Sequence, residues 1–335
     1  MPDGQPVPQA QPNPAGQPDP AAQPDPATQP DPAARKPPVA QVAPNARAAP
    51  DEQSIPDVRT VTAGIDGSPE SLDAADWAAR EALLRRLSLH LVHVEPPPRP
   101  NGSAVLRNSA LVDHAALHLS YAHPALGIIE EQLTGDPVET LAGTAESSEL
   151  LVVGSRGNSA LTGLMVGSVA LAVAAVAACP VALVRAGEQP EDEREGAADA
   201  PFRPVLLGLD IGRPCDELLE YAFGAAAARR TALHVVHTWT LSAPPRLPAR
   251  GVPDQGEEKL RRLAAVLTPW QHKFPGTEVV PRVVHGRAGH HLLKASAGAG
   301  LLVIGRSAEA GPRLGATAHS VIHHVPRPVV VVPHA

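Results

Sequence analysis

The stretch from residue 150 to residue 184, LLVVGSRGNSALTGLMVGSVALAVAAVAACPVALV, constrains the fold more than any other part of the chain. Leu150–Val153 is a short apolar run that stops at Gly154, as a buried strand does. Ser168 then opens an apolar stretch, about Val169–Ala178, which reads as a helix. A strand end, a glycine-rich loop and a helix N-terminus together form an anion site, because free backbone N–H groups and the helix dipole both favour phosphate.

The glycines of this loop have a specific spacing. Gly154, Gly157, Gly167 and Ser168 give the pattern G-x2-G-x9-G-[ST], and Cys179-Pro180-Val181 leads into the next strand. The pattern resembles the universal stress protein family in its ATP-binding branch, whose members hold the ribose and the phosphates with this loop. The resemblance implies that role for the following residues: Gly154, Gly157, Gly167, Ser168 and Val169.

Two other interpretations of this stretch stay open. Residues 161–184 carry no charge and are long enough to span a membrane as a helix. Against a membrane helix, the stretch is rich in Ala and Gly, Pro180 interrupts it, and a later repeat of the unit carries charged residues. The second alternative is a structural loop whose glycines serve tight packing only.

The charge, the cysteine content and the first residues of the chain bear on its partners and its compartment. The chain has 28 basic and 35 acidic residues and a net charge of −7, which does not indicate a nucleic-acid surface. Its two cysteines, Cys179 and Cys215, cannot form a disulfide framework and suit a reducing cytosol. The first residues show neither the basic nor the apolar part of a secretory signal, so we expect a cytoplasmic protein without a membrane partner.

The 335 residues divide into four parts. Residues 1–56 repeat units such as QPDPAA and predict a disordered tail, for which no motif indicates a role as tether or docking segment. Residues 57–186 and 203–335 each predict one domain, and the second repeats the first. Residues 187–202 are acidic and polar, which is typical of a solvated linker.

The first domain alternates strands and helices. Strands are expected at residues 59–65, 88–94, 127–133, 150–153 and 181–184, and helices at about 68–86, 103–120, 138–145 and 169–178. This alternation predicts an α/β fold of two tandem doubly wound domains, each a mainly parallel five-stranded sheet with helices on both faces. Such domains are Rossmann-like, and the resemblance adds a similarity to adenine nucleotide alpha hydrolases.

Ligands of such sheets bind at the carboxyl ends of the strands, where the strand order reverses. Asp66 and Gly154 would then face one crevice. Asp66, in GIDGS, resembles an aspartate that contacts the nucleoside in ATP-binding relatives, and Val94, in LVHV, stands where a residue packs on adenine. Asp66 also suits a helix cap or an Asx-turn, and the two roles are compatible.

The second domain departs from the glycine pattern. His234 and His237 are in register with His90 and His93, so the two copies align. Gly305 matches Gly154, but the second glycine is missing, the loop is shorter, and Ala316 stands in place of Ser168. We therefore predict that the second domain has lost ATP binding and keeps a structural or regulatory role.

The sequence contains little that supports P-loop, serine-nucleophile or metal chemistry. A P-loop needs a lysine, and the four lysines of the chain are all outside the first domain. Phosphate charge would then be neutralised by backbone N–H groups, Ser168, Arg156 and a Mg²⁺ ion, if one is bound. No catalytic residue is assigned, G-x-S-x-G is absent, and the spacing of His319 and His323 alone does not define a metal site.

The last strands of the two domains predict how the copies assemble. Residues 181–184 and 329–332 would pair within one chain, as two such domains typically do in the family, and a homodimer of chains stays an alternative because edge strands seek partners. The preferred function is an adenine-nucleotide-responsive stress or signalling module. A slow ATPase or autophosphorylating enzyme and a structural protein without nucleotide stay open as alternatives.

Overall fold

A computed structural model describes residues 59–97, 109–155, 166–197, 199–240, 252–309 and 311–335. The chain divides into two units, residues 1–54 and 55–335, and the second unit holds all the described residues. The tail, which is expected to be disordered, lies outside the described residues, and so do residues 156–165 of the glycine loop.

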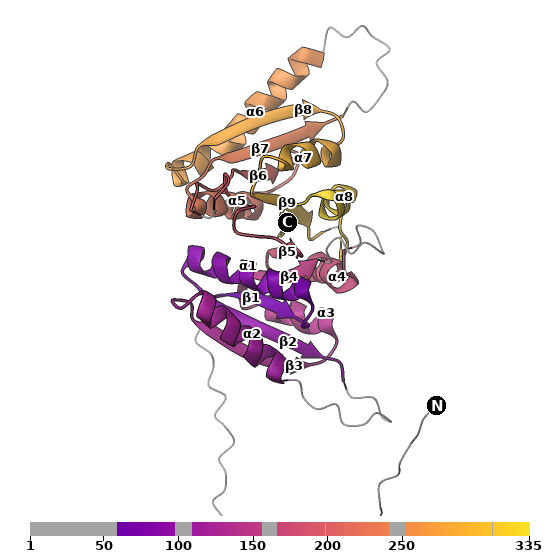
Figure 1. Cartoon of the computed structure of the whole chain (residues 1–335). Helices are drawn as coiled ribbons and strands as arrows, with labels where there is room; N and C mark the ends of the chain where they lie inside the picture. Colours follow the sequence, from indigo (N-terminus) through magenta and orange to yellow (C-terminus); the bar gives the residue numbers. More distant parts are fainter. Residues whose placement is uncertain (1–58, 98–108, 156–165, 198, 241–251, 310) are drawn as a thin grey trace, which may run out of the picture. The chain divides into compact units, whose positions relative to one another are not determined.

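The second unit is built on one ten-stranded sheet with the order β3-β2-β1-β4-β5-β10-β9-β6-β7-β8 (Figure 1). The strands are β1 Thr60–Ile65, β2 Ser88–Glu95, β3 Ile128–Thr134, β4 Ser148–Ser155, β5 Val181–Arg185, β6 Val205–Gly208, β7 Leu233–Trp239, β8 Val279–His285, β9 Leu301–Ser307 and β10 Val329–His334. The helices are α1 Pro69–Arg85, α2 Ser109–Ala122, α3 Pro137–Thr144, α4 Ser168–Val176, α5 Asp216–Arg229, α6 Val252–Lys273, α7 Ala288–Ser296 and α8 Ala316–His324. The expected α/β fold is confirmed, and the expected strands of the first copy begin and end within two residues of the observed ones.

The two copies join through their last strands. β5 and β10 are antiparallel, with Val329 opposite Leu183 and Val331 opposite Val181, whereas the other strand pairs of the sheet are parallel. The β-branched residues of both strands suit a buried sheet position. This pairing is the pseudo-dimer within one chain that the sequence predicted, and it leaves β3 and β8 as the outer strands of the sheet.

Local sequence explains where α1 begins, and α1 and α5 end in the same way. Ser68 caps α1, its hydroxyl accepting from the N–H of Ser71 at 3.2 Å, and Pro69 follows at the first helical position. Arg86 ends α1 with a left-handed φ of 59°, and Arg230 ends α5 in the same way with a φ of 51°. These matching ends fix the alignment of α1 with α5.

Each face of the sheet carries one apolar core. The core on the side of α1 and α5 includes Trp77 and Phe223, and the core on the side of α4 and α8 includes Val173 and Val321. Most other members are Ala, Val and Leu, as a chain with 2% aromatic residues requires. The membrane-helix interpretation is wrong: residues 181–185 form a strand, and no helix in the described part of the chain is long and apolar enough to cross a membrane.

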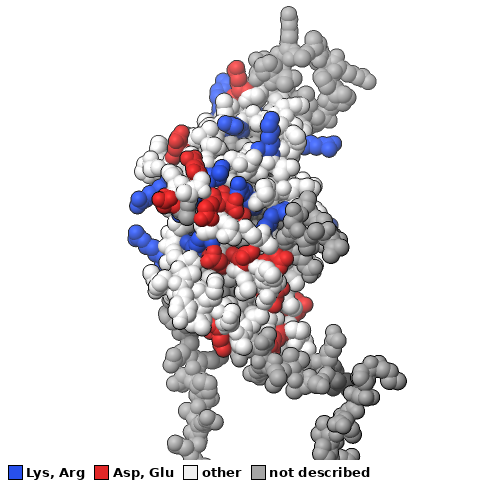
Figure 2. Space-filling model, viewed as in Figure 1, with Lys and Arg blue, Asp and Glu red and all other residues white. Residues whose placement is uncertain are grey.

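Two carboxylates of the acidic segment between the copies, Glu188 and Glu193, are buried. Glu193 is 3% exposed and pairs with Arg80 and Arg229, each at 3.4 Å. The guanidinium of Arg194 lies 3.8 Å from the ring centroid of Phe202. Figure 2 shows acidic and basic side chains gathered in the middle of one face, where α1 and α5 meet in Figure 1. Composition predicted a solvated linker; in the structure Glu193 pairs with one arginine of each copy and so fastens the segment.

Candidate functional site

The carboxyl ends of β1 and β4 lie side by side. The two strands are parallel, and Gly64 pairs with Val153 near their ends. Asp66 follows β1 directly, and Gly154 is the penultimate residue of β4. Both predicted residues therefore reach the same edge of the sheet, where α1 begins.

Asp66 organises the start of α1. Its Oδ1 accepts hydrogen bonds from the Ser68 N–H at 2.9 Å and from the Ser68 hydroxyl at 2.5 Å. Burial alone would raise the pKa of Asp66, but the hydrogen bonds from Ser68 and Ser71 outweigh burial and lower that pKa. The residue is therefore an ionised turn residue, and its contact with a nucleoside stays a prediction.

Gly154 has a packing role that the glycine pattern does not reveal. A Cβ at this position would lie 2.7 Å from the carbonyl oxygen of Glu70 and 2.9 Å from the backbone nitrogen of Ser71. Both atoms belong to the first turn of α1, whose backbone cannot shift without moving the helix. The close approach of α1 to β4 therefore requires glycine here whether or not a ligand binds.

The N-terminus of α4 is the part of the glycine motif best suited to an anion. Gly167 is the N-cap, and as a glycine it has no side chain that could cap the helix. Ser168 and Val169 lie in the first turn with exposed side chains. The N–H groups of a first helical turn and the positive end of the helix dipole together favour a phosphate.

Val94 is the penultimate residue of β2 and pairs with Leu133 of β3. Its side chain is partly buried against the core that contains Val153. Arg156 and Gly157 lie outside the described residues. The six other predicted residues lie at carboxyl ends of strands or at the start of α4, which are the positions that a nucleotide in this fold would contact.

The second copy has an open crevice at the equivalent edge. Its volume is about 480 Å³, and the ends of β6, β7 and β9 and the start of α8 line it. Asp210 takes the place of Asp66 and accepts a hydrogen bond from the Gly212 N–H at 3.0 Å. Thr238 stands where Val94 stands. Space is therefore not what the second copy lacks, and its differences are in side chains and glycine spacing.

Arg306, which the sequence analysis missed, connects this crevice to the first copy. Its Nη2 donates to the carbonyl oxygen of Ala177, the C-cap of α4, at 2.6 Å. Arg185 makes the converse contact, donating to the carbonyl oxygens of Ile322 and His323 at 3.2 and 2.7 Å near the end of α8. Each copy thus places an arginine at the negative end of a helix of the other. The sequence signal that could have identified Arg306 is a charged residue at a core-facing position of β9, a strand that is otherwise mostly apolar.

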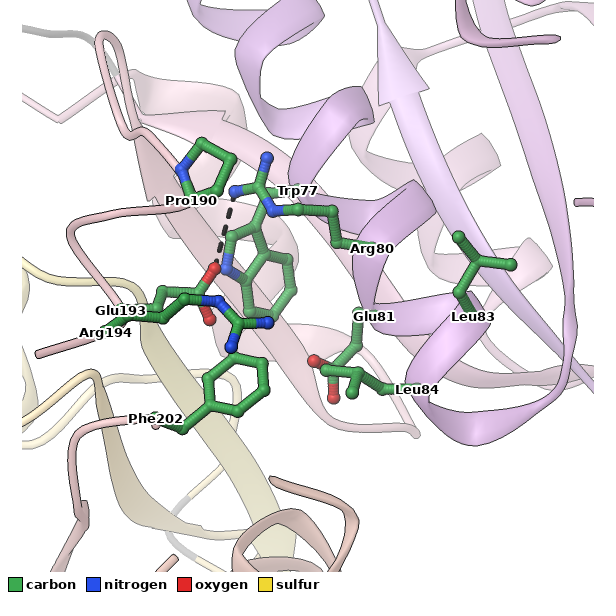
Figure 3. Close-up of a pocket in the computed structure, with 9 residues that line it drawn as sticks. All are labelled: Trp77, Arg80, Glu81, Leu83, Leu84, Pro190, Glu193, Arg194 and Phe202. Carbon is green, nitrogen blue, oxygen red and sulfur yellow. Dashed lines mark hydrogen bonds and ion pairs between the residues drawn. The ribbon is translucent and has the colours of Figure 1, made fainter. Parts of the chain in front are cut away.

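The cavity drawn in Figure 3 lies away from the strand ends, between α1 and the segment that joins the copies. Its volume is about 290 Å³. The residues drawn are Trp77, Arg80, Glu81, Leu83, Leu84, Pro190, Glu193, Arg194 and Phe202, and the dashed line marks the ion pair of Arg80 with Glu193. Two arginines and two glutamates balance one another here. We therefore assign this cavity to the interface between the copies and not to a ligand.

Histidines are numerous but do not converge. The rings of His319 and His323 lie 4.4 Å apart between centroids, as expected for residues four apart on α8. Within the described ranges, no group of three His, Cys, Asp or Glu residues is placed to hold a metal ion.

Comparisons with known proteins agree with this architecture. The family model described as the universal stress protein family matches residues 57–185 and 201–333. A universal stress protein of Mycobacterium tuberculosis is 32% identical over 308 residues, which cover 81% of this chain and 94% of the relative. A second one from the same species is 32% identical over 289 residues. A crystal structure of a universal stress protein from Archaeoglobus fulgidus covers 82% of this chain and 98% of its own, with 19% identity and a TM-score of 0.58, and so shares the fold.

Proposed function

Because the chain belongs to the universal stress protein family, with two copies of the domain in tandem, we propose that it binds ATP in the first copy and acts as a nucleotide-responsive stress or signalling module. The second copy serves as its structural or regulatory partner. In this proposal the binding residues are Asp66, Val94, Gly154, Arg156, Gly157, Gly167, Ser168 and Val169, and Mg²⁺ accompanies the phosphates. The domains span residues 57–186 and 203–335.

The exposed N-terminus of α4, whose N-cap Gly167 has no side chain, carries this proposal. It lies at the edge of the sheet that Asp66 and Gly154 share, and it ends the complete glycine pattern. The equivalent helix, α8, also has a glycine N-cap, Gly315, without a side-chain cap. However, its first residue is Ala316, and the loop before it lacks the second glycine. The hydroxyl and the spacing therefore distinguish the two copies more than the helix does.

The proposal extends to compartment and assembly. Cys179 and Cys215 are both free and buried, which suits the reducing cytoplasm. Burial raises the pKa of Cys179 to about 12, so this thiol is a packing residue and not a nucleophile. A homodimer of chains would use surfaces other than β5 and β10, since these two strands already pair with each other.

Calorimetric titration tests this function on the full chain. ATP with Mg²⁺ should bind near one site per chain, and Gly167→Val should abolish the binding. Gly315→Val is the matched control, because it changes the same helix position in the second copy, where a Cβ would meet nothing within 4 Å. Binding that survives Gly167→Val and disappears in Gly315→Val would move the site to the second copy. Absence of binding in the parent chain would refute the ATP proposal.

A further inference from the structure

The second copy has a groove on the flank of α7 that the nucleotide proposal does not use. Its volume is about 430 Å³. Leu206, Val236 and Val284, from β6, β7 and β8, supply apolar parts of its lining. The groove therefore faces the sheet on the side of α7, and a carbon skeleton could rest against these three side chains.

The polar lining of this groove is entirely basic. It consists of His234 on β7, Arg282 on β8, and His291 and Lys294 on α7, and no carboxylate lines it. Within the described part of the chain, the side chains of Arg282 and Lys294 form no ion pair and no hydrogen bond. Cations that are brought together without a counter-charge favour an anionic ligand.

The first copy shows that the fold does not require this basic character. The copies align here because Leu141 of α3 packs 3.1 Å from the Cβ position of Gly64, and Leu292 of α7 packs 2.9 Å from that of Gly208. In this alignment three positions of the first copy become more basic in the second: Glu131 becomes Arg282, Thr140 becomes His291 and Gly143 becomes Lys294.

The change from Glu131 to Arg282 reverses a specific interaction. In the first copy, Nε2 of His90 lies 2.9 Å from a carboxylate oxygen of Glu131. In the second copy, burial lowers the pKa of His234 and the charge of Arg282 lowers it further, while Glu278 acts in the opposite direction. The second copy has therefore lost the internal carboxylate that serves the equivalent histidine, and an external anion can replace it.

We propose that this groove binds a small organic phosphate, with the oxyanion between Arg282 and Lys294 and the carbon part on the apolar floor. A dianion matches two fixed cations better than a monoanion does, and an arginine fork suits phosphate oxygens. Arg282 and Lys294 are exposed, so added salt weakens the binding.

Histidine NMR on the full chain tests this site with phenyl phosphate, inorganic phosphate and benzoate as probes, each at the same ionic strength set with chloride. His234→Gln identifies the His234 signal. Saturating phenyl phosphate should raise the pKa of His234, and it should bind more tightly than either inorganic phosphate or benzoate. Equal binding of phenyl phosphate and benzoate would overturn the choice of a dianion, and no saturable change at His234 would overturn the site.

Two substitutions of equal charge provide the comparison. Arg282→Glu rebuilds the pair found in the first copy and should abolish the response of His234. Arg262→Glu makes the same charge change on α6, at an exposed position of a helix whose Leu263 and Leu267 pack in the core of the opposite face. It should leave the response intact. Loss in both variants, or in neither, would show that only the net charge of the protein or a different site is responsible. The Gly167→Val chain should respond like the parent, so this test does not depend on ATP binding.

Discussion

Arg85 of α1 and Arg229 of α5 occupy the same position in the two copies, yet a single carboxylate serves both. Nε of Arg85 lies 2.7 Å from Oε1 of Glu81, and Nη2 of Arg229 lies 2.5 Å from Oε2 of the same residue. The counterpart of Glu81 in α5 is Ala225. The comparison teaches that the two copies do not form a symmetric interface, because one copy supplies the acid and both supply the base.

The strand ends of the two copies differ in the same uneven way. The first keeps the glycine pattern and Ser168, whereas the second keeps the space but has Ala316 and the long side chain of Arg306. Arg306 does not stay within its own copy, since it donates to the end of α4. Equivalent regions of the two copies thus have different roles. Arg306 of the second copy holds the copies together, and in our proposal the glycine pattern of the first copy binds a ligand.

Removing the charge of the shared carboxylate of Glu81 should have the largest effect on stability. Burial would raise the pKa of Glu81, but the charges of Arg229 and Arg85 outweigh burial and lower that pKa to about 2. Glu81→Gln leaves Arg229 buried without full compensation and should lower the free energy of unfolding by about 3–5 kcal/mol. Urea unfolding measures the change.

The control for this substitution is Glu149→Gln, which removes the more exposed partner of Arg85. It should cost much less, since exposed pairs contribute little. Because the folded pKa of Glu81 lies below its usual value of 4.5, its contribution is lost as the pH falls from about 4.5 towards 2. A Glu81→Gln protein that loses no more stability than Glu149→Gln would contradict the central role of this carboxylate.

The matching glycines at the ends of β4 and β9 should respond differently to alanine. A Cβ on Gly154 meets the backbone of α1, whereas a Cβ on Gly305 lies 2.6 Å from Nε2 of His334, an atom of a side chain that can shift without moving a helix. We expect Gly154→Ala to cost about 1–3 kcal/mol and Gly305→Ala clearly less. Thermal unfolding of both variants measures the difference, and an equal loss would show that His334 is as rigid as the helix backbone.

A third prediction concerns Glu188, which lies in the segment between the copies and is 6% exposed. Burial, with the neighbouring charges of Glu193 and Asp192, raises its pKa to about 8. A raised folded pKa means that the stabilising effect of the protonated carboxyl is present at pH 4.5 and lost as the pH rises through 8. When the pH is raised from 5 to 9, the free energy of unfolding of Glu188→Gln should therefore increase relative to that of the parent by on the order of 1–2 kcal/mol.

Unfolding in urea at both pH values measures this gain. Glu191→Gln is the control, because it removes an exposed carboxylate from the same segment. Its free energy of unfolding should follow that of the parent at both pH values. A pH profile of Glu188→Gln that runs parallel to the parent would contradict the assignment.

The smallest effect should come from exchanging the first residues of α4 and α8. Ser168→Ala should weaken ATP binding by about 0.5–1.5 kcal/mol, the range for one hydrogen bond, or several-fold in Kd. Ala316→Ser adds the hydroxyl to the second copy. If the hydroxyl alone separates the copies, a second binding event should appear in calorimetry; if glycine spacing also matters, it should not.

Much of this molecule could be predicted from local pattern. Alternating apolar runs and turn residues gave the α/β order, and Ser68 and Pro69 marked the start of α1 within one residue. The repeat of LVHV as VVHT aligned the copies, and the structure agrees: Nδ1 of His93 lies 2.8 Å from the carbonyl oxygen of Ile65, and Nδ1 of His237 lies 3.0 Å from that of Leu209. The order of elements, the start of α1 and the alignment of the copies depend on patterns of neighbouring residues, which a sequence displays directly.

The sequence by itself determined the class of fold, the tandem repeat and the residues that resemble a nucleotide site. Only the tertiary structure decided that Gly154 packs against α1, that the acidic segment is held between two arginines, and that Glu81 serves both copies. The physical reason is that each of these depends on groups far apart in the chain, and the Arg229–Glu81 contact joins residues 148 positions apart. Composition shows that such charged residues are present, but only the folded structure determines which of them are buried together and must therefore pair.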